Sequence, residues 1–249
     1  MSLITRRNAL VGGTGLLLAG CDKITASPTV KNVLSLGQKA NLTAQRLVQD
    51  RNALAPEFTR ADLSPKFREN GTRNPNNDDY NRMVASNFAD WTLAVDGLVA
   101  RPFRLSLAQL RNAPARTQIT RHDCVEGWSA IGEWTGVPLG LLLRQAGLSS
   151  NAKYVVFHCA DQLLGAQYYE SIDLVDAFHP QTILAHTMNG QPLSVGHGAP
   201  IRLRVERQLG YKQAKYVMRV EAVASLDGIY GGKGGLWEDR SGYQWYAGI

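Results

Sequence analysis

The sequence lacks several features that would place it in a class directly. Only three of its 249 residues are cysteines, too few for the disulfide framework of a small secreted domain. No run of Lys and Arg reaches the cluster size of a nucleic-acid-binding tail, and the net charge of +6 is modest. Neither an internal repeat nor the glycine fingerprint of a dinucleotide-binding fold occurs in the globular part. We therefore expect no nucleic-acid partner and no hydride carrier.

A long hydrophobic run is also missing. The apolar stretch over residues 9–20 has about a dozen residues, whereas a membrane-spanning helix needs roughly 20. Arg6 and Arg7 precede this stretch, and it runs into Leu18-Ala19-Gly20-Cys21. This pattern is typical of a secretory signal, and paired arginines address a bacterial export route. The final four residues resemble a lipoprotein box with Cys21 as the lipidated residue; an uncleaved N-terminal anchor with a chance cysteine is the alternative.

The predicted location of the protein is therefore the periplasm. Asp22, directly after Cys21, resembles the signal that keeps some bacterial lipoproteins in the inner membrane. We expect twin-arginine export of a folded protein, followed by lipid anchoring to that membrane. Removing residues 1–21 leaves about 228 residues, which is within the size range of one large domain.

The remaining chain has two predicted parts. Residues 22–80 are expected to form a tether, a helix over residues 40–54 that Pro56 ends, and a loop over residues 61–80 that wraps the surface. Residues 81–249 carry the globular pattern. Strands are expected over residues 91–97, 118–124, 154–159, 201–205 and 216–223. A short helix or turn is expected over 105–110, and a helix over 137–146 that Gly147 caps. Because strands and short helices mix without a regular βα rhythm, we predict an α+β fold with a mixed β-sheet.

Cys124 is the most informative residue of the globular part. It follows a predicted strand, and a thiolate in such a position suits a soft or high-valent transition metal. Arg121 and His122 are placed to lower its pKa and favour the ligand form. A disulfide with Cys159 in an oxidising compartment is the alternative, and from the residues alone the two are equally favoured. Further candidate clusters are His158-Cys159-Ala160-Asp161, residues 197–202, and residues 208–212, where a glycine loop with Lys212 is suited to an anion.

Several polar residues have a plainer interpretation. His158 and His186 are expected to be packed and hydrogen-bonded, and Arg204 and Arg207 to be solvated charges on a strand face. The glycine-rich residues 231–235 are expected to form a surface turn in preference to a phosphate nest.

Seven segments in a fixed order resemble one known family. They are Cys-Val-Glu-Gly-Trp-Ser (124–129), Trp-Thr-Gly-Val-Pro-Leu (134–139), Tyr-Tyr-Glu-Ser-Ile-Asp (168–173), His-Pro-Gln-Thr (179–182), Asn-Gly-Gln-Pro-Leu (189–193), Gly-Ala-Pro-Ile-Arg (198–202) and Gly-Tyr-Lys (210–212). No single segment would suffice. Their collinear set is similar to the molybdopterin-binding domain of the sulfite oxidase family over about residues 81–246, and in particular to the exported bacterial branch that includes the methionine-sulfoxide reductases.

The resemblance implies a mononuclear molybdenum centre held by a single pyranopterin. In this family one cysteine thiolate binds the metal, and Cys124 is the match, which favours a metal ligand over the disulfide. Arg202 and the loop around Lys212 match phosphate-binding positions. The implied cofactor-binding residues are Asn81, Arg82, Cys159, His197, Arg202, Gly210, Tyr211 and Lys212.

The implied activity is oxygen-atom transfer on a small-molecule substrate. Electrons would pass to or from a membrane b-type cytochrome or a cytochrome c, beside which a lipid anchor would hold the enzyme. The arginine-rich anion pocket of the sulfite oxidases is not recognisable after Cys124, so the substrate does not carry over. The alternatives are a zinc or copper protein that uses His122, Cys124, His158 and Cys159, and a non-catalytic exported binding lipoprotein.

Overall fold

The computed structural model describes residues 27–48 and 50–249, and the chain divides into two units at residue 50. The first unit holds the helix α2 (Pro28–Val48), and the second runs from Arg51 to Ile249. The predicted signal, with Arg6, Arg7, Cys21 and Asp22, lies outside the described residues. Among the residues that are described, no helix combines the length and apolarity needed to cross a membrane.

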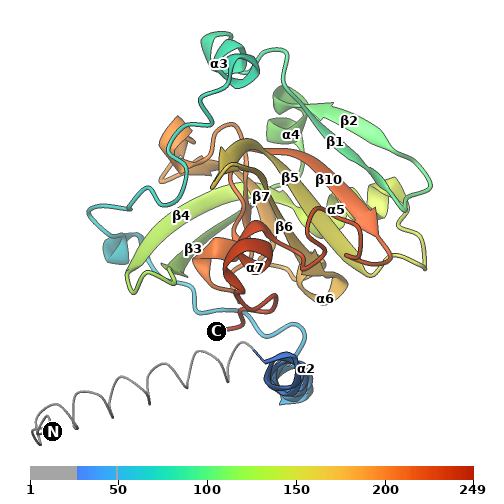
Figure 1. The fold of residues 1–249 in the computed structure, drawn as a ribbon. Coiled ribbons are helices and arrows are strands. Elements are labelled where there is room, and N and C mark those ends of the chain that lie inside the picture. Colours follow the sequence, from blue (N-terminus) through green and yellow to red (C-terminus); the bar gives the residue numbers. More distant parts are fainter. Residues whose placement is uncertain (1–26, 49) are drawn as a thin grey trace, which may run out of the picture. The chain divides into compact units, whose positions relative to one another are not determined.

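The second unit is built on two β-sheets (Figure 1). The first sheet is mixed, because its first and last strands in chain order pair in parallel while the other neighbours are antiparallel. Its order is β2 (Phe103–Ser106), β1 (Thr92–Gly97), β10 (Val217–Val223), β5 (Tyr154–Leu163) and β6 (Ala166–Asp173).

The second sheet is antiparallel throughout. It contains a long hairpin that carries Cys124 at its turn. Its order is β3 (Arg116–Asp123), β4 (Ser129–Pro138), β7 (Ile183–Met188) and β8 (Gln191–Pro192), with β9 (Arg202–Arg204) pairing on β7.

Short helices connect the strands, and several have clear local causes. Ser106 and Gln109 form a capping box at the start of one, and Gly147, in the left-handed region at φ 70°, ends another. The helices of this unit are α3 (Asp78–Ala85), α4 (Leu107–Asn112), α5 (Leu139–Ala146), α6 (Leu174–Ala177) and α7 (Leu236–Ser241), with 3-10 turns η1 (Arg60–Asp62), η2 (Val195–His197) and η3 (Gly210–Lys212).

The main hydrophobic core packs the first sheet against α4 and α5. Trp91, Leu139 and Phe157 are fully buried there. A smaller core lies around Phe67 and Trp134 on the second sheet. Four of the predicted strands, whose apolar residues alternate or run continuously, are observed as β1, β3, β5 and β10.

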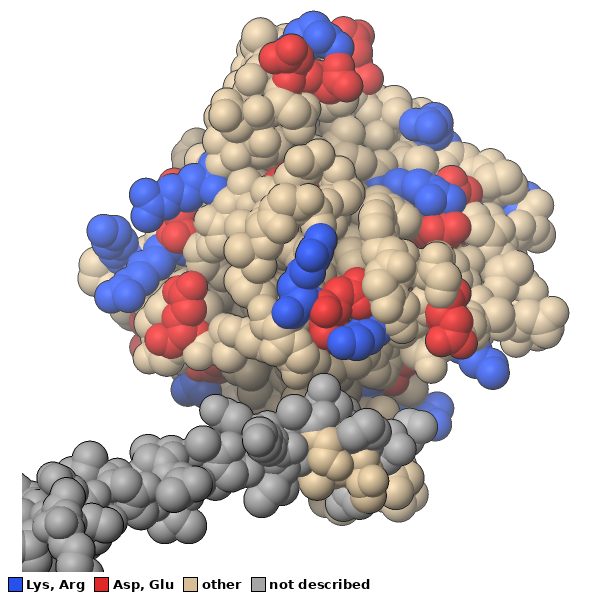
Figure 2. All heavy atoms as spheres, in the orientation of Figure 1, with Lys and Arg blue, Asp and Glu red and all other residues tan. Residues whose placement is uncertain are grey.

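The surface charge is mixed. Figure 2 shows Lys and Arg side chains interspersed with Asp and Glu over the described residues of the face drawn, without a continuous area of one sign.

The helix predicted over residues 40–54 is displaced. The observed helix α2 spans Pro28–Val48, and the chain from Ala53 to Ala55 is not helical. The carbonyl of Ala53 accepts a hydrogen bond from His179 at 3.0 Å, and the backbone of Ala55 bonds to the Gln181 side chain at 2.8 and 3.0 Å. These tertiary bonds satisfy the backbone in an extended form, so the apolar spacing through Leu54 does not produce a helix.

Residues 55–72 then form a strap along the second sheet. Glu57 bridges Thr120, the amide of Phe58 donates to Ile119, and Ser64 bonds to Ile131. The strap ends at residues 70–72, where it reaches the cleft that is described below.

The interpretation of Arg204 and Arg207 as solvated charges is wrong. Both are buried, Arg204 completely. Arg204 lies over the ring of Trp134, 4.4 Å from its centroid, and pairs with Glu206 at 2.5 Å. Arg207 pairs with Asp176 at 3.0 Å. The segment alternates in sequence as a half-exposed strand would, but the second sheet is covered on both sides here.

Candidate functional site

A cleft with about 630 Å³ of empty space, its open mouth included, lies where the strap, both sheets and the C-terminal segment meet. Cys124 reaches it from the β3–β4 turn and Asp161 from β5. Its lining residues are Asn70, Gly71, Thr72, Cys124, Val125, Glu126, Asp161, Leu163, Tyr168, Gly210, Tyr211, Gln213, Lys215, Trp237 and Tyr243.

A tight turn presents Cys124 to the cleft. Its amide donates to the carbonyl of Trp128 at 2.9 Å, and its carbonyl accepts from Gly127 at 3.0 Å. Gly127 has φ 83°, a left-handed conformation that favours glycine. The turn thus directs the thiol inward while Val125 stays exposed on the rim.

Cys124 and Cys159 are both free thiols, so the alternative of a disulfide does not apply to this structure. Burial raises the pKa of the Cys124 thiol above its ordinary value. The expectation that Arg121 and His122 lower this pKa is wrong. Arg121 is exposed and pairs with Asp123 at 2.9 Å, and burial, followed by the charge of Arg204, lowers the pKa of His122 so that its ring is neutral.

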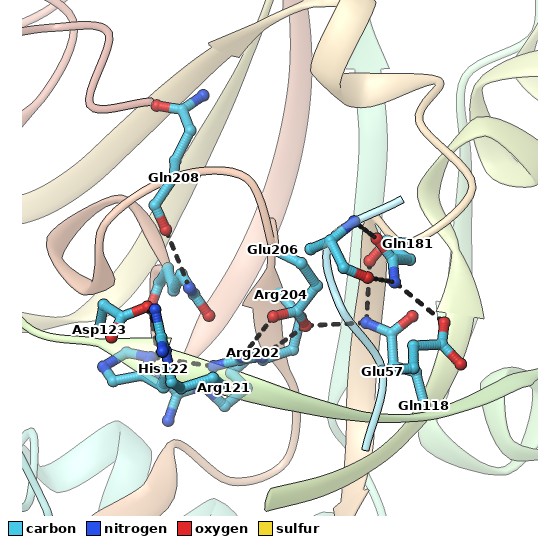
Figure 3. A network of polar contacts seen from close by, with 12 residues as sticks. Glu57, Gln118, Arg121, His122, Asp123, Gln181, Arg202, Arg204, Glu206 and Gln208 are labelled. Carbon is cyan, nitrogen blue, oxygen red and sulfur yellow. Dashed lines mark hydrogen bonds and ion pairs between the residues drawn. The ribbon is translucent and has the colours of Figure 1, made fainter. Parts of the chain in front are cut away.

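His122 belongs to a buried polar network (Figure 3). Arg204 donates through Nη1 to His122 Nδ1 at 3.0 Å. Because a guanidinium only donates, Nδ1 must accept, and the ring proton is on Nε2. The network continues through Glu206 and Gln118, 2.8 Å apart, to the carbonyl of Gln181. It connects the strap to the floor of the cleft.

Gly210 meets this network at close range. A Cβ at this position would lie 2.4 Å from His122 Nε2. Only a glycine therefore lets the η3 turn pack against the histidine ring.

Two buried cations beside the cleft have no carboxylate partner among the described residues. Arg202 is 1% exposed; it donates to the carbonyls of His197 and Gln213 at 3.2 and 3.3 Å, and its Nε has no partner. Lys215 is 7% exposed and donates to the carbonyls of Asn70 at 2.7 Å, Gly196 at 3.0 Å and Thr72.

The Cβ atoms of Arg202 and Lys215 both lie close to Gly198. A Cβ on Gly198 would lie 2.9 Å from Lys215 Cβ and 3.3 Å from Arg202 Cβ. Burial lowers the pKa of Arg202 to about 9 and that of Lys215 to about 7, and each cation lies in the field of another. Such charges are costly to bury unless an anion joins them.

Aromatic residues form the opposite wall. Tyr168 donates to the carbonyl of Tyr211 at 2.9 Å, and the Tyr211 ring packs edge-on against Tyr243 at 5.0 Å. Trp237 stacks on Tyr243 at 5.4 Å.

A buried ion cluster fixes this wall from behind. Lys212 Nζ lies 2.5 Å from Glu170 Oε2 and 2.5 Å from Glu238 Oε1, and all three side chains are almost completely buried. The cluster lies close in sequence to the aromatic wall. Lys212 follows Tyr211, Glu238 follows Trp237, and Glu170 lies two residues after Tyr168. The cluster therefore holds together η3, β6 and α7.

Comparison with known proteins identifies the domain. Residues 81–227 match the oxidoreductase molybdopterin binding domain. The chain belongs to this sulfite-oxidase-like molybdopterin-binding family. It is accordingly a molybdopterin-dependent oxidoreductase with a molybdenum–molybdopterin cofactor.

Two relatives of this chain carry names of sulfoxide reductases. A putative protein-methionine-sulfoxide reductase subunit, YedZ1, from Azospira oryzae is 39% identical over 243 residues, which cover 98% of this chain and 86% of that one. The protein-methionine-sulfoxide reductase catalytic subunit MsrP of Xanthomonas campestris pv. campestris is 32% identical, with 85% and 66% covered. The chain thus spans slightly less than two thirds of the MsrP relative.

A solved structure supports the fold. The sulfane dehydrogenase SoxCD from Paracoccus pantotrophus superposes with a TM-score of 0.53 at 24% identity, over 61% of this chain and 41% of that one. This likeness, together with the mixed sheet, confirms the α+β prediction.

The molybdopterin-binding residues expected from the sequence divide into three groups. Cys124, Gly210 and Tyr211 line the cleft, and Arg202 lies beside it. His197 contributes its carbonyl to Arg202, while its ring bonds to Ser194 and Phe67. Asn81 and Arg82 lie on α3, exposed and not among the cleft-lining residues, and Cys159 faces the main core and a second hollow that Arg82 also lines.

Lys212 needs a correction. Its ammonium is already neutralised by two carboxylates and does not line the cleft, so it is not placed to pair with a phosphate there. Lys215, three residues later, lines the cleft and forms no ion pair with a described carboxylate. Asn70, which also lines the cleft, belongs to the segment that the sequence predicts as a surface loop. The run Lys-Gln-Ala-Lys contained the signal for Lys215, but spacing alone does not tell its two lysines apart.

The residues present fit the family's cofactor. Arg202 and Lys215 supply two buried positive charges without an ion-paired carboxylate among the described residues, and Arg202 Nε is a buried donor without a partner. A phosphate with two negative charges would satisfy such a donor set. In the described part of the chain, no three His, Cys, Asp or Glu residues come together as a metal site, which disfavours the zinc or copper alternative.

The Lys212 cluster leads to a first prediction. Lys212→Met should lower the free energy of unfolding by about 3–5 kcal/mol, because two buried carboxylates then lack their cation. The loss should be larger at pH 8 than at pH 5, since burial raises the pKa of Glu170 and lower pH protonates this carboxylate in the folded state. Urea unfolding of the loaded enzyme measures both effects. Lys153→Met, at an exposed lysine, is the control, and a loss below about 1 kcal/mol at Lys212 would contradict the cluster's role.

Proposed function

We propose that this chain is an exported molybdenum enzyme that reduces sulfoxides, with methionine sulfoxide as the substrate class. The observation that carries the proposal is the free thiol of Cys124 in a cleft that Lys215 lines and beside which Arg202 is buried, both cations without an ion-paired carboxylate among the described residues. The names of the sulfoxide-reductase relatives support this direction of reaction.

The lining of the cleft favours a neutral substrate. Lys215 is the only Lys or Arg among the described lining residues, and it faces the carbonyls of the strap. A sulfite-binding pocket would need cations that converge on the substrate. An uncharged sulfoxide needs mainly the apolar and aromatic surface of Tyr168, Trp237 and Tyr243.

Cys124 would bind the molybdenum, and Arg202 and Lys215 would hold the phosphate of the pterin. The bound centre supplies two-electron chemistry in which an oxygen atom passes between substrate and metal. Gly210 lets the η3 backbone approach closely, and Tyr211 and its aromatic neighbours exclude water from that side.

We further propose that the enzyme works in the periplasm, held to the inner membrane by a lipid on Cys21. An external electron partner, a membrane b-type cytochrome or a cytochrome c, would exchange electrons with it. One acyl chain anchors weakly, so we expect multiple acylation.

The proposed activity predicts a defined role for Cys124. Cys124→Ser should lower sulfoxide-dependent turnover more than roughly 100-fold, because loss of a metal ligand exceeds the usual cost of disturbing its surroundings. The assay follows oxidation of a reduced viologen dye by methionine sulfoxide, together with the molybdenum signal in electron paramagnetic resonance. Unchanged far-ultraviolet circular dichroism should show an intact fold. Full activity in the Ser variant would refute the ligand assignment.

The two unpaired cations should control cofactor retention. Arg202→Ala and Lys215→Met each remove charged hydrogen bonds worth about 1.5–3 kcal/mol. Each variant should retain cofactor at least about tenfold more weakly. Molybdenum and pterin content of the purified protein measures this, with Arg111→Ala as the control for loss of an exposed arginine. Full occupancy combined with only a raised KM would count against the assignment.

The proposed export and lipidation can be tested separately from the activity. Arg6→Lys together with Arg7→Lys should trap folded precursor in the cytoplasm, and Cys21→Ser should block lipidation. Mass spectrometry of the mature N-terminus, combined with membrane fractionation, is the measurement. A free, unmodified N-terminus downstream of Cys21 would disprove the lipoprotein, while leaving export itself standing.

A further inference from the structure

Asp161 is a cleft residue that the assignments above do not use. It lies on β5, is 3% exposed and lines the same cleft as Cys124. One of its carboxylate oxygens, Oδ1, is buried without a hydrogen-bond partner in the described part of the chain. The backbone around it is well fixed, because its own carbonyl accepts from Gln167 at 2.8 Å.

The cleft has two acidic side chains, and they differ in environment. Glu126 is exposed at the β3–β4 turn and accepts a hydrogen bond from Trp128 Nε1 at 3.0 Å. Asp161 is buried and forms no ion pair with a described residue. A carboxyl group taken out of water without a paired cation favours its protonated form.

The groups around Asp161 do not cancel this effect. Burial raises the pKa of Asp161 to about 6, while the Thr72 hydroxyl and the Lys215 charge act in the opposite direction. A carboxyl that titrates there exchanges protons effectively near neutral pH. The titratable groups that interact with it are Lys215, Tyr80, Cys159, Tyr168 and Tyr216.

Sulfoxide reduction needs such a group. The sulfur–oxygen bond breaks, sulfur gains two electrons and becomes a thioether, and oxygen leaves as water with two protons. The electrons come from the external donor through the bound cofactor. An acid fixed in the cleft can transfer a proton to the oxygen while the sulfur–oxygen bond breaks.

We propose that Asp161 is a catalytic acid of the cleft, which supplies one of the two protons to the departing oxygen and recovers a proton from solvent through the cleft mouth. The second proton comes from solvent. This inference rests on the proposed function and names the proton donor for that same reaction.

The test is a pH profile of sulfoxide-dependent dye oxidation by the loaded enzyme. In the wild type the rate should fall as pH rises through about 6, up to tenfold per pH unit, because the acid form disappears. Asp161→Asn keeps the shape but cannot donate this proton. It should lower turnover at pH 6 by roughly 100-fold to 10,000-fold and remove this limb of the profile.

Two matched variants separate catalysis from structure. Asp161→Glu keeps an acid and should restore part of the rate together with a pH-dependent limb. Asp90→Asn removes an exposed carboxylate outside the cleft and should leave the profile unchanged. Molybdenum and pterin content must stay equal to wild type in Asp161→Asn. A loss of cofactor in that variant would overturn the proposal, since Asp161 would then be a cofactor contact, and so would a retained limb near pH 6.

The result also separates this inference from the proposed function. If the enzyme oxidises a sulfur substrate and reduces no sulfoxide, the proposed direction fails, but Asp161 should then accept the proton and its limb should rise with pH. If no turnover is found, infrared titration still decides. A protonated carboxyl band at pH 5 that is lost by pH 7.5 and absent from Asp161→Asn supports the assignment; its absence from the wild type overturns it.

Discussion

The constraint on which the site depends is the burial of Arg202 and Lys215 without carboxylate partners. Removing two cations from water is expensive, and backbone carbonyls repay only part of that cost. To supply those carbonyls, the strap must bring Asn70, and the η2 turn must bring Gly196, to one ammonium group. Gly198 must remain a glycine so that both side chains can begin beside it. Segments far apart in the chain therefore converge where an anion is needed.

A second buried charge cluster differs from the first because its cation is paired with carboxylates. Lys212 is matched by Glu170 and Glu238, so this cluster is complete without a ligand and acts on the aromatic wall. Burial and the charge of Glu238 raise the pKa of Glu170 well above its usual value, so a shared proton further reduces the net charge. Charge balance, more than the presence of a lysine, thus distinguishes a structural cluster from a binding site.

The sequence pattern predicted those helices and strands that depend on neighbouring residues in the chain. The continuous apolar run of β5 and the glycine that ends α5 lie where the sequence indicates. The failures have tertiary causes: Gln181 holds residues near Ala55 extended, and Trp134 covers Arg204, which the alternation of its strand assigned to solvent. For the site, the order of seven segments was sufficient to indicate the family and Cys124. It could not separate Lys212 from Lys215, because their difference lies in carboxylates contributed by β6 and α7.

Unpaired buried cations also connect folding with cofactor loading. An anion that binds only the folded chain stabilises it by mass action, and here it would also remove an electrostatic penalty that the empty fold must carry. The twin-arginine pair at Arg6 and Arg7 is consistent with that order of events, because an export route for folded proteins lets the cofactor enter first. A chain threaded across the membrane unfolded would have to close around Arg202 and Lys215 in a compartment where the cofactor is not made. If the chain is exported by this route, as we propose, the charge pattern of the cleft and the signal at the N-terminus would meet one requirement, that the anion be in place before export.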